Sequence, residues 1–336
     1  MTVCVIGEAL VDLVYQSSDP DGTDRYLAHP GGSPFNVAIG LARLGRHSRL
    51  LARLSGDAFG RQLRAQASAN GVDLSLAVPA VESSTLAVVS LDAERNANYD
   101  FYRTGTADWQ WNAAELARIP ADADWLHAGS LASWIDPGAL AIEQRLAMLT
   151  PTTVLSYDPN IRPALLGDRG QAVARIERLV ALSRVVKASA EDLAWLYPDR
   201  GADSTLRHWQ RLGPAVVVVT DGSRGARAIG ADAAVIEVPG RSARVVDTVG
   251  AGDAFMAGLI DALITSGLLA DGGRPSSEQL RPAVEQAVLV AALTVARAGA
   301  DPPTAAELMA EGAKATASEH RRSDSDEERS ERGAEQ

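Results

Sequence analysis

The stretch DTVGAGDAFMAG, residues 247–258, combines residue types that could bind an anion and accept a proton. Gly250, Ala251 and Gly252 precede an apolar segment that reads as a helix, and the backbone N–H groups at such a start attract phosphate. Asp253 places a carboxylate beside them. That acid either caps the helix and meets its dipole, or it takes the proton of a hydroxyl that attacks phosphorus.

Two common phosphate-binding motifs do not account for this stretch. A Walker loop requires a lysine after its last glycine, and no lysine follows Gly252. A dinucleotide fingerprint requires a third glycine where Phe255 stands. What remains is a glycine-rich turn that opens an apolar helix and carries an acid at its start.

A second stretch, GGSPFNVAIGLARLG at 31–45, has the composition of a ligand-binding turn. Its paired glycines permit close backbone approach, and Pro34 stiffens the turn. Asn36 is expected to begin the following helix, either as a simple cap or as a side chain that both donates to and accepts from a ligand. Upstream, Asp12 interrupts an apolar segment, which costs stability unless its carboxylate is satisfied.

The elements around these stretches indicate an α/β fold. Short apolar strands such as VCVI and AVVVV alternate with amphipathic helical segments, which predicts a doubly wound, mostly parallel sheet covered on both faces. Residues 11–30 and 84–103 instead read as strand pairs without helices, and we expect them to form a small sheet beside the core. Ligands bind at the carboxyl ends of such strands, so this small sheet is placed to act as a lid.

Composition excludes several classes of function. A net charge of −11 disfavours nonspecific binding to nucleic acid or to anionic membranes, and no apolar run approaches the ~18 residues of a membrane helix. The single cysteine, Cys4, can form no internal disulfide and indicates a reducing cytoplasm. The five histidines are scattered and form no motif for a metal site with soft ligands. The segment 312–336 is dense in charge and serine, which predicts a disordered tail.

The two glycine-rich stretches together resemble the N-terminal and C-terminal motifs of the ribokinase-like (PfkB-type) carbohydrate kinases, in the same order and at a similar separation. The resemblance implies one kinase domain over residues 1–311. It further implies that Asp253 is the catalytic base and that the amides of residues 250–252 hold the γ-phosphate of ATP. By the same resemblance Asp12, Gly32 and Asn36 contact sugar hydroxyls.

Further segments resemble the nucleotide and metal elements of this family. TDGSRGA, at 220–226, implies nucleotide phosphate contacts from Thr220, Gly222 and Gly225, with a plain β-turn as the alternative. KASAED, at 187–192, resembles an Asn-x-x-Glu element but has Ser189 and Asp192 in those places. Ser189 is then a nucleotide contact, and Asp192 reaches Mg²⁺ through water unless it is only a helix-start acid.

The segment TVARAGADPP, at 294–303, resembles the part of these kinases that joins an aspartate in holding a monovalent cation, here Asp247 and K⁺. Pro303 stands where some members offer a hydroxyl, and this departure argues against activation by K⁺.

The substrate is indicated by DPNIRPALL (158–166) and YDFYRTGTADW (99–109), which resemble the fructokinase branch. They add Arg103 and Arg162, which suit sugar hydroxyls, suit a carboxylate equally well, or simply pair with local acids. Fructose is therefore the expected acceptor, with 2-keto-3-deoxygluconate as the rival. Nucleosides are disfavoured because no stacking platform is evident.

The sequence thus predicts an ATP-dependent, Mg²⁺-requiring fructokinase. A sugar- or nucleotide-sensing protein with a kinase fold is the non-enzyme alternative, and a dehydrogenase is disfavoured by the missing fingerprint. Apolar positions on the small sheet further suggest pairing of two subunits through the lid.

Overall fold

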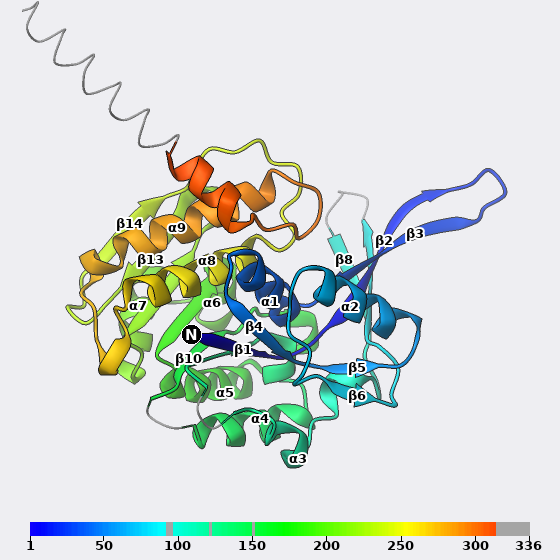
Figure 1. Ribbon diagram of the computed structural model, residues 1–336, viewed down its shortest axis with the longest axis horizontal. Helices are drawn as coiled ribbons and strands as arrows, with labels where there is room; N and C mark the ends of the chain where they lie inside the picture. The colour runs from blue at the N-terminus through cyan, green and yellow to red at the C-terminus, as the bar shows by residue number, and fades with distance from the viewer. Residues whose placement is uncertain (92–96, 121–122, 150–151, 314–336) are drawn as a thin grey trace, which may run out of the picture.

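The computed structural model describes residues 1–91, 97–120, 123–149 and 152–313, and its centre is an eight-stranded sheet (Figure 1). The strands run in the order β14-β13-β12-β11-β10-β9-β1-β4, and the pairings from β12 to β4 are all parallel. The β13 and β14 strands extend the sheet in antiparallel fashion. The predicted doubly wound, mostly parallel sheet is confirmed. The strand bounds are β1 Thr2–Ile6, β4 His47–Leu51, β9 Trp125–Gly129, β10 Val154–Asp158, β11 Val185–Ser189, β12 Val216–Thr220, β13 Gly225–Ile229 and β14 Val235–Pro239.

Helices cover both faces of this sheet, which explains why its strands are apolar along their whole length. Val3 and Val5 of β1 face one hydrophobic core, whereas Cys4 and Ile6 face the other. The first core contains α1 (Ser33–Arg43), α2 (Ala58–Ala69), α8 (Ala251–Ser266) and α9 (Ser277–Val295). The second contains α3 (Ala113–Leu116), α4 (Gly138–Ala147), α5 (Arg169–Leu182), α6 (Ala190–Leu196) and α7 (Ala202–Leu212).

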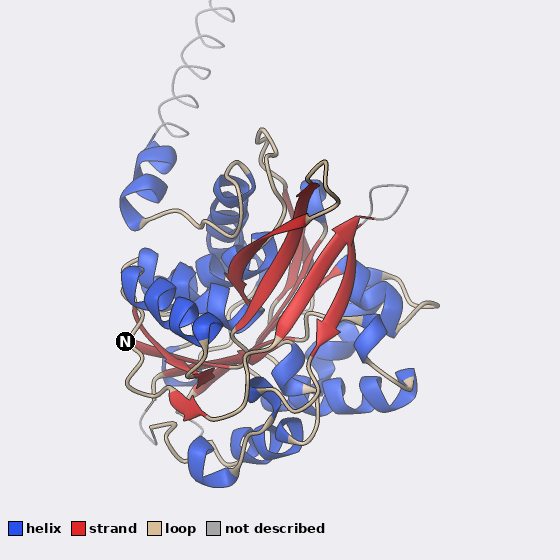
Figure 2. Cartoon of the chain, turned by 90° about the vertical axis from the view of Figure 1, so that its right-hand side faces the viewer, coloured by secondary structure: helices blue, strands red, loops and turns tan. Residues whose placement is uncertain are grey.

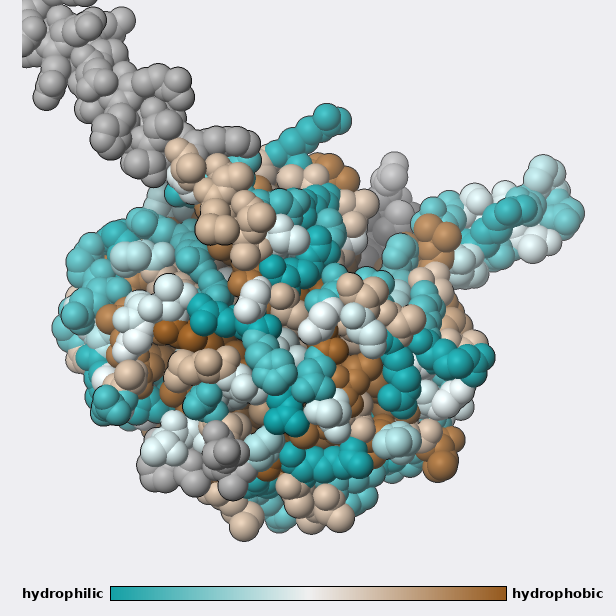
Figure 3. Space-filling model, viewed as in Figure 1, coloured by the Kyte–Doolittle hydropathy of each residue, from teal (hydrophilic) through white to brown (hydrophobic). Residues whose placement is uncertain are grey.

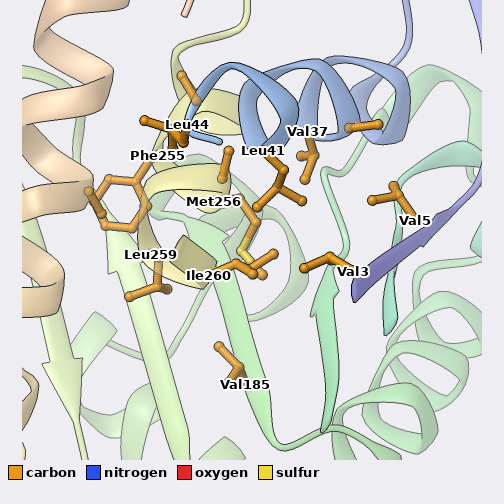
Figure 4. Close-up of a cluster of buried hydrophobic side chains, with 14 of the residues drawn as sticks. Val3, Val5, Val37, Leu41, Leu44, Val185, Phe255, Met256, Leu259 and Ile260 are labelled. Atoms are coloured by element: carbon orange, nitrogen blue, oxygen red, sulfur yellow. The ribbon is translucent and has the colours of Figure 1, made fainter. Parts of the chain in front are cut away.

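The α1 and α8 helices pack directly on each other above β1 (Figure 4). Leu41 of α1 and Met256 of α8 are both fully buried at this contact. A Cβ atom added to Gly40 would lie 2.7 Å from the Cβ of Ala257, so only a glycine permits this approach of the two helices. This packing holds the first turns of α1 and α8 side by side, although more than 200 residues separate them in sequence.

A four-stranded sheet stands beside the core, as Figure 2 shows. It has the order β3-β2-β7-β8 and consists of β2 (Leu10–Ser18), β3 (Asp24–Gly31), β7 (Leu86–Leu91) and β8 (Ala97–Tyr102). The two predicted strand pairs therefore join into one small sheet, through a parallel contact between β2 and β7. The β2–β3 hairpin projects well beyond the body of the molecule (Figure 3). A third, two-stranded sheet pairs β5 (Arg53–Ser55) with β6 (Val78–Ala80).

The described chain ends in a helical segment over 305–313, which includes the first two residues of the predicted tail. The rest of that tail, 314–336, lies outside the described residues. Among the described helices, none combines the length and the apolar character that crossing a membrane requires.

Candidate active site

The paired first turns of α1 and α8 bring Asn36 and Asp253 into direct contact. The Asn36 side-chain amide donates to Asp253 Oδ2 at 2.8 Å. Asn36 does not begin its helix, as the sequence had suggested, because Gly32 occupies the N-cap position and Pro34 lies in the first turn. The side chain of Asn36 therefore lies one turn inside α1 and reaches across to α8. A role as a simple cap is excluded.

Asp253 lies in the first turn of α8, but the N-cap residue is Gly250 and no side chain caps the helix. Burial raises the pKa of the Asp253 carboxyl, and hydrogen bonds from Ser33 and Asn36 oppose this rise, as do the charges of Lys187 and Arg162. The carboxylate thus sits in a water-poor position that favours proton uptake, while its partners hold it in one orientation. These properties suit a general base, and that role stays a prediction.

The turn before α8 is tight, and its role in holding a phosphate stays a prediction. Gly250 has a φ of 75°, and a Cβ there would lie 2.5 Å from the Cβ of Ala300. The Ala251 N–H donates to the Thr248 carbonyl at 3.3 Å, which closes the turn. A Cβ on Gly252 would lie 3.1 Å from the Lys187 Nζ, so this glycine lets the backbone approach a buried cation.

Of the sugar-side residues predicted from the sequence, Asp12, Gly32 and Arg162 lie near the Asn36–Asp253 contact. Burial raises the pKa of Asp12 to about 6; the charge of Arg162 lowers it and the charge of Asp253 raises it, so the three groups interact electrostatically. Gly32 has a φ of 104°, and a Cβ there would lie 2.7 Å from the Glu8 carbonyl oxygen. Arg103 follows β8 at the edge of the small sheet, and its contact with a ligand stays a prediction.

Lys187 is a site residue whose role the sequence reasoning missed. Its Nζ donates to Asp158 Oδ2 at 2.6 Å and to the Gly252 carbonyl at 3.3 Å. Both side chains are buried; burial lowers the pKa of Lys187, but the charge and hydrogen bond of Asp158, with the charges of further acids, raise it above its usual value and keep the lysine charged. A lysine inside the apolar strand VVKAS was the available signal, since an unpaired buried charge is costly. The lysine ammonium of this ion pair thus lies directly against the glycine turn.

The predicted nucleotide residues lie at the carboxyl ends of β11 and β12. Ser189 and Thr220 are register partners on these neighbouring strands. After Thr220 the chain forms a tight turn in which Gly222 and Gly225 have φ angles of 51° and 99°. A hollow of about 400 Å³ adjoins this turn. Its lining residue Gly240 packs against the turn so closely that a Cβ on Gly240 would lie 2.1 Å from the Ser223 carbonyl oxygen. The other residues lining the hollow are Val238, Pro239, Arg241, Ser242, Glu285 and Val288.

The two proposed metal-side acids both hold the backbone in place. Asp192 accepts the N–H groups of Ile161 at 2.8 Å and Ser189 at 2.9 Å, and the Ser189 hydroxyl completes a capping box. Asp247 accepts the N–H groups of Val249 at 3.0 Å and Gly299 at 2.8 Å, which ties the glycine turn to the 294–303 segment. Their roles toward Mg²⁺ and a monovalent cation stay predictions.

Comparison with known proteins gives this geometry a family. A family model described as pfkB family carbohydrate kinase matches residues 1–306 of the 336 residues. The chain belongs to the pfkB family of carbohydrate kinases. It is accordingly a phosphotransferase whose acceptor is an alcohol group, as the two glycine-rich motifs had indicated.

Several relatives of this kinase are fructokinases. The fructokinase of Rhizobium leguminosarum bv. trifolii is 36% identical over 269 residues, which cover 80% of this chain and 81% of that protein. That of Klebsiella pneumoniae is 34% identical over 272 residues, covering 79% and 85%. A crystal structure of fructokinase from Xylella fastidiosa with bound ATP superposes with a TM-score of 0.82 at 27% identity, covering 92% and 97%. One from Vibrio cholerae O395, with fructose, ADP and calcium ion bound, gives 0.78 at 30% identity, covering 92% and 98%.

Glu8 and Asp108 are two further buried acids to which the sequence analysis assigned no role. Glu8 is 1% exposed and accepts the Ala132 N–H at 3.1 Å. Asp108, also 1% exposed, accepts the Ala9 N–H at 2.8 Å. Burial, helped by the charge of Asp108, raises the pKa of Glu8 to about 7, although hydrogen bonds to Ser130 and Ala132 oppose this rise.

The raised pKa of Glu8 predicts a pH-dependent effect of Glu8→Gln on stability. The folded state holds the Glu8 proton more tightly than the unfolded state, so ionisation as pH rises from 4.5 to about 7 destabilises the wild type. Glutamine keeps an acceptor for Ala132 and has no proton to lose. The variant should gain up to about 3 kcal/mol over the wild type across this range, with no further change above it.

Urea titrations at about pH 5 and about pH 8 measure this difference in the free energy of unfolding. Glu191→Gln, at an exposed position in the first turn of α6, is the matched control and should show no comparable change with pH. A stability advantage of Glu8→Gln that is equal at both pH values, or larger at the lower one, would contradict the assignment.

Proposed function

We propose that this kinase transfers the γ-phosphate of ATP to the 6-hydroxyl of fructose, with Asp253 as the general base. The observation that carries the proposal is the hydrogen bond between Asn36 and Asp253, which joins the sugar-side motif to the phosphate-side motif at one point. The fructokinase relatives support the choice of sugar, since one of them has been solved with fructose and ADP bound.

The chemistry follows from the charges around Asp253. A hydroxyl that attacks phosphorus loses its proton, and a carboxylate with a raised pKa within hydrogen-bond reach accepts it. Asp12, Gly32 and Asn36 orient the sugar, while Arg103 and Arg162 supply further donors. We assign the N–H groups of Gly250 and Gly252 to the transferring phosphoryl group, joined by that of Ala251 once it leaves the Thr248 carbonyl, and the Lys187 ammonium beside them offsets part of the negative charge that gathers there.

The nucleotide is proposed to lie along the ends of β11 and β12. Ser189, Thr220, Gly222 and Gly225 then contact its phosphates, and its base occupies the hollow between Val238 and Val288. The apolar walls suit an aromatic base, and the adjacent polar groups of Ser242 and Glu285 suit its edge. The bound ATP of the Xylella fastidiosa fructokinase supports a nucleotide site in this fold.

Magnesium fits this arrangement as an ion held mainly by phosphates and water. In the described parts of the chain, no group of three or more His, Cys, Asp or Glu side chains could cage a metal. Mg²⁺ commonly binds through one or two carboxylates plus substrate phosphates, and Asp192 is the carboxylate we assign to one of its waters. When bound, the ion neutralises charge on the phosphates.

Two broader proposals accompany this function. A reducing cytoplasm is the proposed compartment, since the only cysteine, Cys4, is buried in the core. Pairing of two subunits through the small sheet is supported by the exposed side chains of Tyr15, Tyr26 and Leu27 on the projecting hairpin (Figure 3). Sedimentation velocity measures this pairing, and a strictly monomeric protein would rule it out.

The variant Asp253→Asn tests the catalytic proposal. The amide keeps the size of the side chain but cannot accept the proton, so kcat should fall by about a hundredfold or more while fructose binding persists. Coupled ADP release measures turnover, and calorimetry measures sugar binding. Asp271→Asn, in the exposed loop beyond α8, is the matched control and should behave as wild type.

Retention of kcat within a few-fold of wild type would remove Asp253 from the role of base. A wild-type protein that binds fructose without releasing ADP would instead be a sensor. Parallel assays with 2-keto-3-deoxygluconate decide between the two acceptors, and a higher kcat/KM for this acid would overturn fructose as the substrate.

A tryptophan at Ser242 tests the nucleotide proposal. Its indole should fill the hollow and raise the KM for ATP about tenfold, a loss of about 1.4 kcal/mol, with the KM for fructose unchanged. Arg244→Trp, two residues along the same exposed segment and outside the lining of the hollow, is the control. An unchanged KM for ATP in Ser242→Trp would place the base elsewhere.

A further inference from the structure

Two residues with strained backbone lie side by side at the carboxyl edge of the sheet. Ser130 has a φ of 55° and Asn160 a φ of 41°, in the left-handed region that side chains other than glycine rarely adopt. They follow the neighbouring strands β9 and β10, and the Asn160 Nδ2 donates to the Ser130 Oγ at 3.1 Å. Strain of this kind persists where surrounding contacts hold the chain in place.

A directed chain of hydrogen bonds runs through these two residues to Arg162. The Arg162 Nη1 donates to the Asn160 Oδ1 at 2.9 Å, and a guanidinium can only donate, so the Asn160 oxygen must face it. The amide NH₂ of Asn160 must then face Ser130, whose hydroxyl accepts it. The single hydroxyl hydrogen of Ser130 is then free to turn toward the buried Glu8 carboxyl, whose pKa Ser130 lowers.

The origin of this chain lies deep in the fold. Glu8 follows β1, Ser130 follows β9 and Asn160 follows β10, which are three adjacent parallel strands. The Glu8 carboxyl accepts the Ala132 N–H at 3.1 Å, so its position is fixed close to the chain. Ser130 orients Asn160, and Asn160 in turn orients Arg162, across the edge of the sheet.

The guanidinium at the end of the chain lies near enough to the sugar side of the site for its charge to act on both Asp12 and Asp253. Within the described part of the chain its hydrogen bonds, to Asn160 and to the Ile161 carbonyl at 2.9 Å, both use Nη1. The N–H groups on Nε and Nη2 thus remain to contact a ligand, in the planar geometry that suits vicinal oxygens.

We propose that Asn160, itself oriented by Ser130, is a positioning residue that fixes the guanidinium of Arg162 for recognition of the sugar. The inference rests on the proposed function, in which Arg162 contacts the sugar. Asn160 touches no substrate and acts through Arg162 alone. Its side-chain NH₂ donates to Ser130 and its side-chain oxygen accepts from Arg162.

The test is a double-mutant cycle with Asn160→Gly and Arg162→Gln, read out as KM for D-fructose and for Mg-ATP. Glycine accepts a φ of 41° without strain, so Asn160→Gly should fold with unchanged or higher thermal stability. Loss of a charged hydrogen-bonding group in Arg162→Gln should raise the fructose KM about tenfold or more. Asn160→Gly should raise it about threefold to tenfold, with the KM for ATP unchanged in both variants.

The double variant distinguishes positioning from direct contact. If Asn160 acts only through Arg162, the double variant should match Arg162→Gln within about twofold. Ser130→Ala, which removes the hydroxyl from the chain, should raise the fructose KM in the same sense as Asn160→Gly. A wild-type fructose KM in Asn160→Gly, or full additivity in the double variant, would overturn the inference and leave the proposed function intact. A wild-type fructose KM in Arg162→Gln would instead overturn the sugar contact of Arg162 itself.

Discussion

The site depends on one hydrogen bond between side chains that stand 217 positions apart, from Asn36 to Asp253. Neither residue could hold this geometry alone, because each lies on the first turn of a helix that must be placed by packing. The close contact of α1 with α8, made possible at Gly40 and filled by Leu41 and Met256, supplies that placement. The apolar core above β1 is thus what aligns the sugar motif with the phosphate motif.

The packing of the site also buries several of its acids, and burial changes their pKa values. Five carboxyl groups of the site and its surroundings have a raised pKa, in each case first of all because they are buried: Glu8, Asp12, Asp108, Asp158 and Asp253. Lys187 and Arg162 are two of the cations near these acids. Five carboxyl groups outnumber these two cations, so ionisation of all of them at once is disfavoured, and a carboxylate among them readily accepts a proton beside a site for phosphate anions.

The parts of this site that lie within one stretch of sequence could be predicted, whereas contacts between distant residues could not. Asp253 and Asn36 could be predicted because glycine-rich turns before apolar helices have a recognisable pattern. The sheet and its accessory strand pairs followed from short apolar runs and their spacing. The partner of Lys187 could not be predicted, because Asp158 lies on a different strand and only the parallel register of the sheet brings them together. The prediction that Asn36 begins its helix was wrong, because the helix starts after Gly32, whose φ of 104° could not be predicted from the sequence.

A crystal structure of the kinase with fructose and a non-hydrolysable ATP analogue would show whether Asp253 meets the attacking hydroxyl. The measured quantity is the distance between the 6-hydroxyl oxygen of the sugar and the nearer carboxylate oxygen of Asp253. We expect a hydrogen-bond distance of about 2.6–3.2 Å, with the hydroxyl directed at the γ-phosphorus. A carboxylate turned away from the sugar, with the hydroxyl held by another side chain, would contradict it.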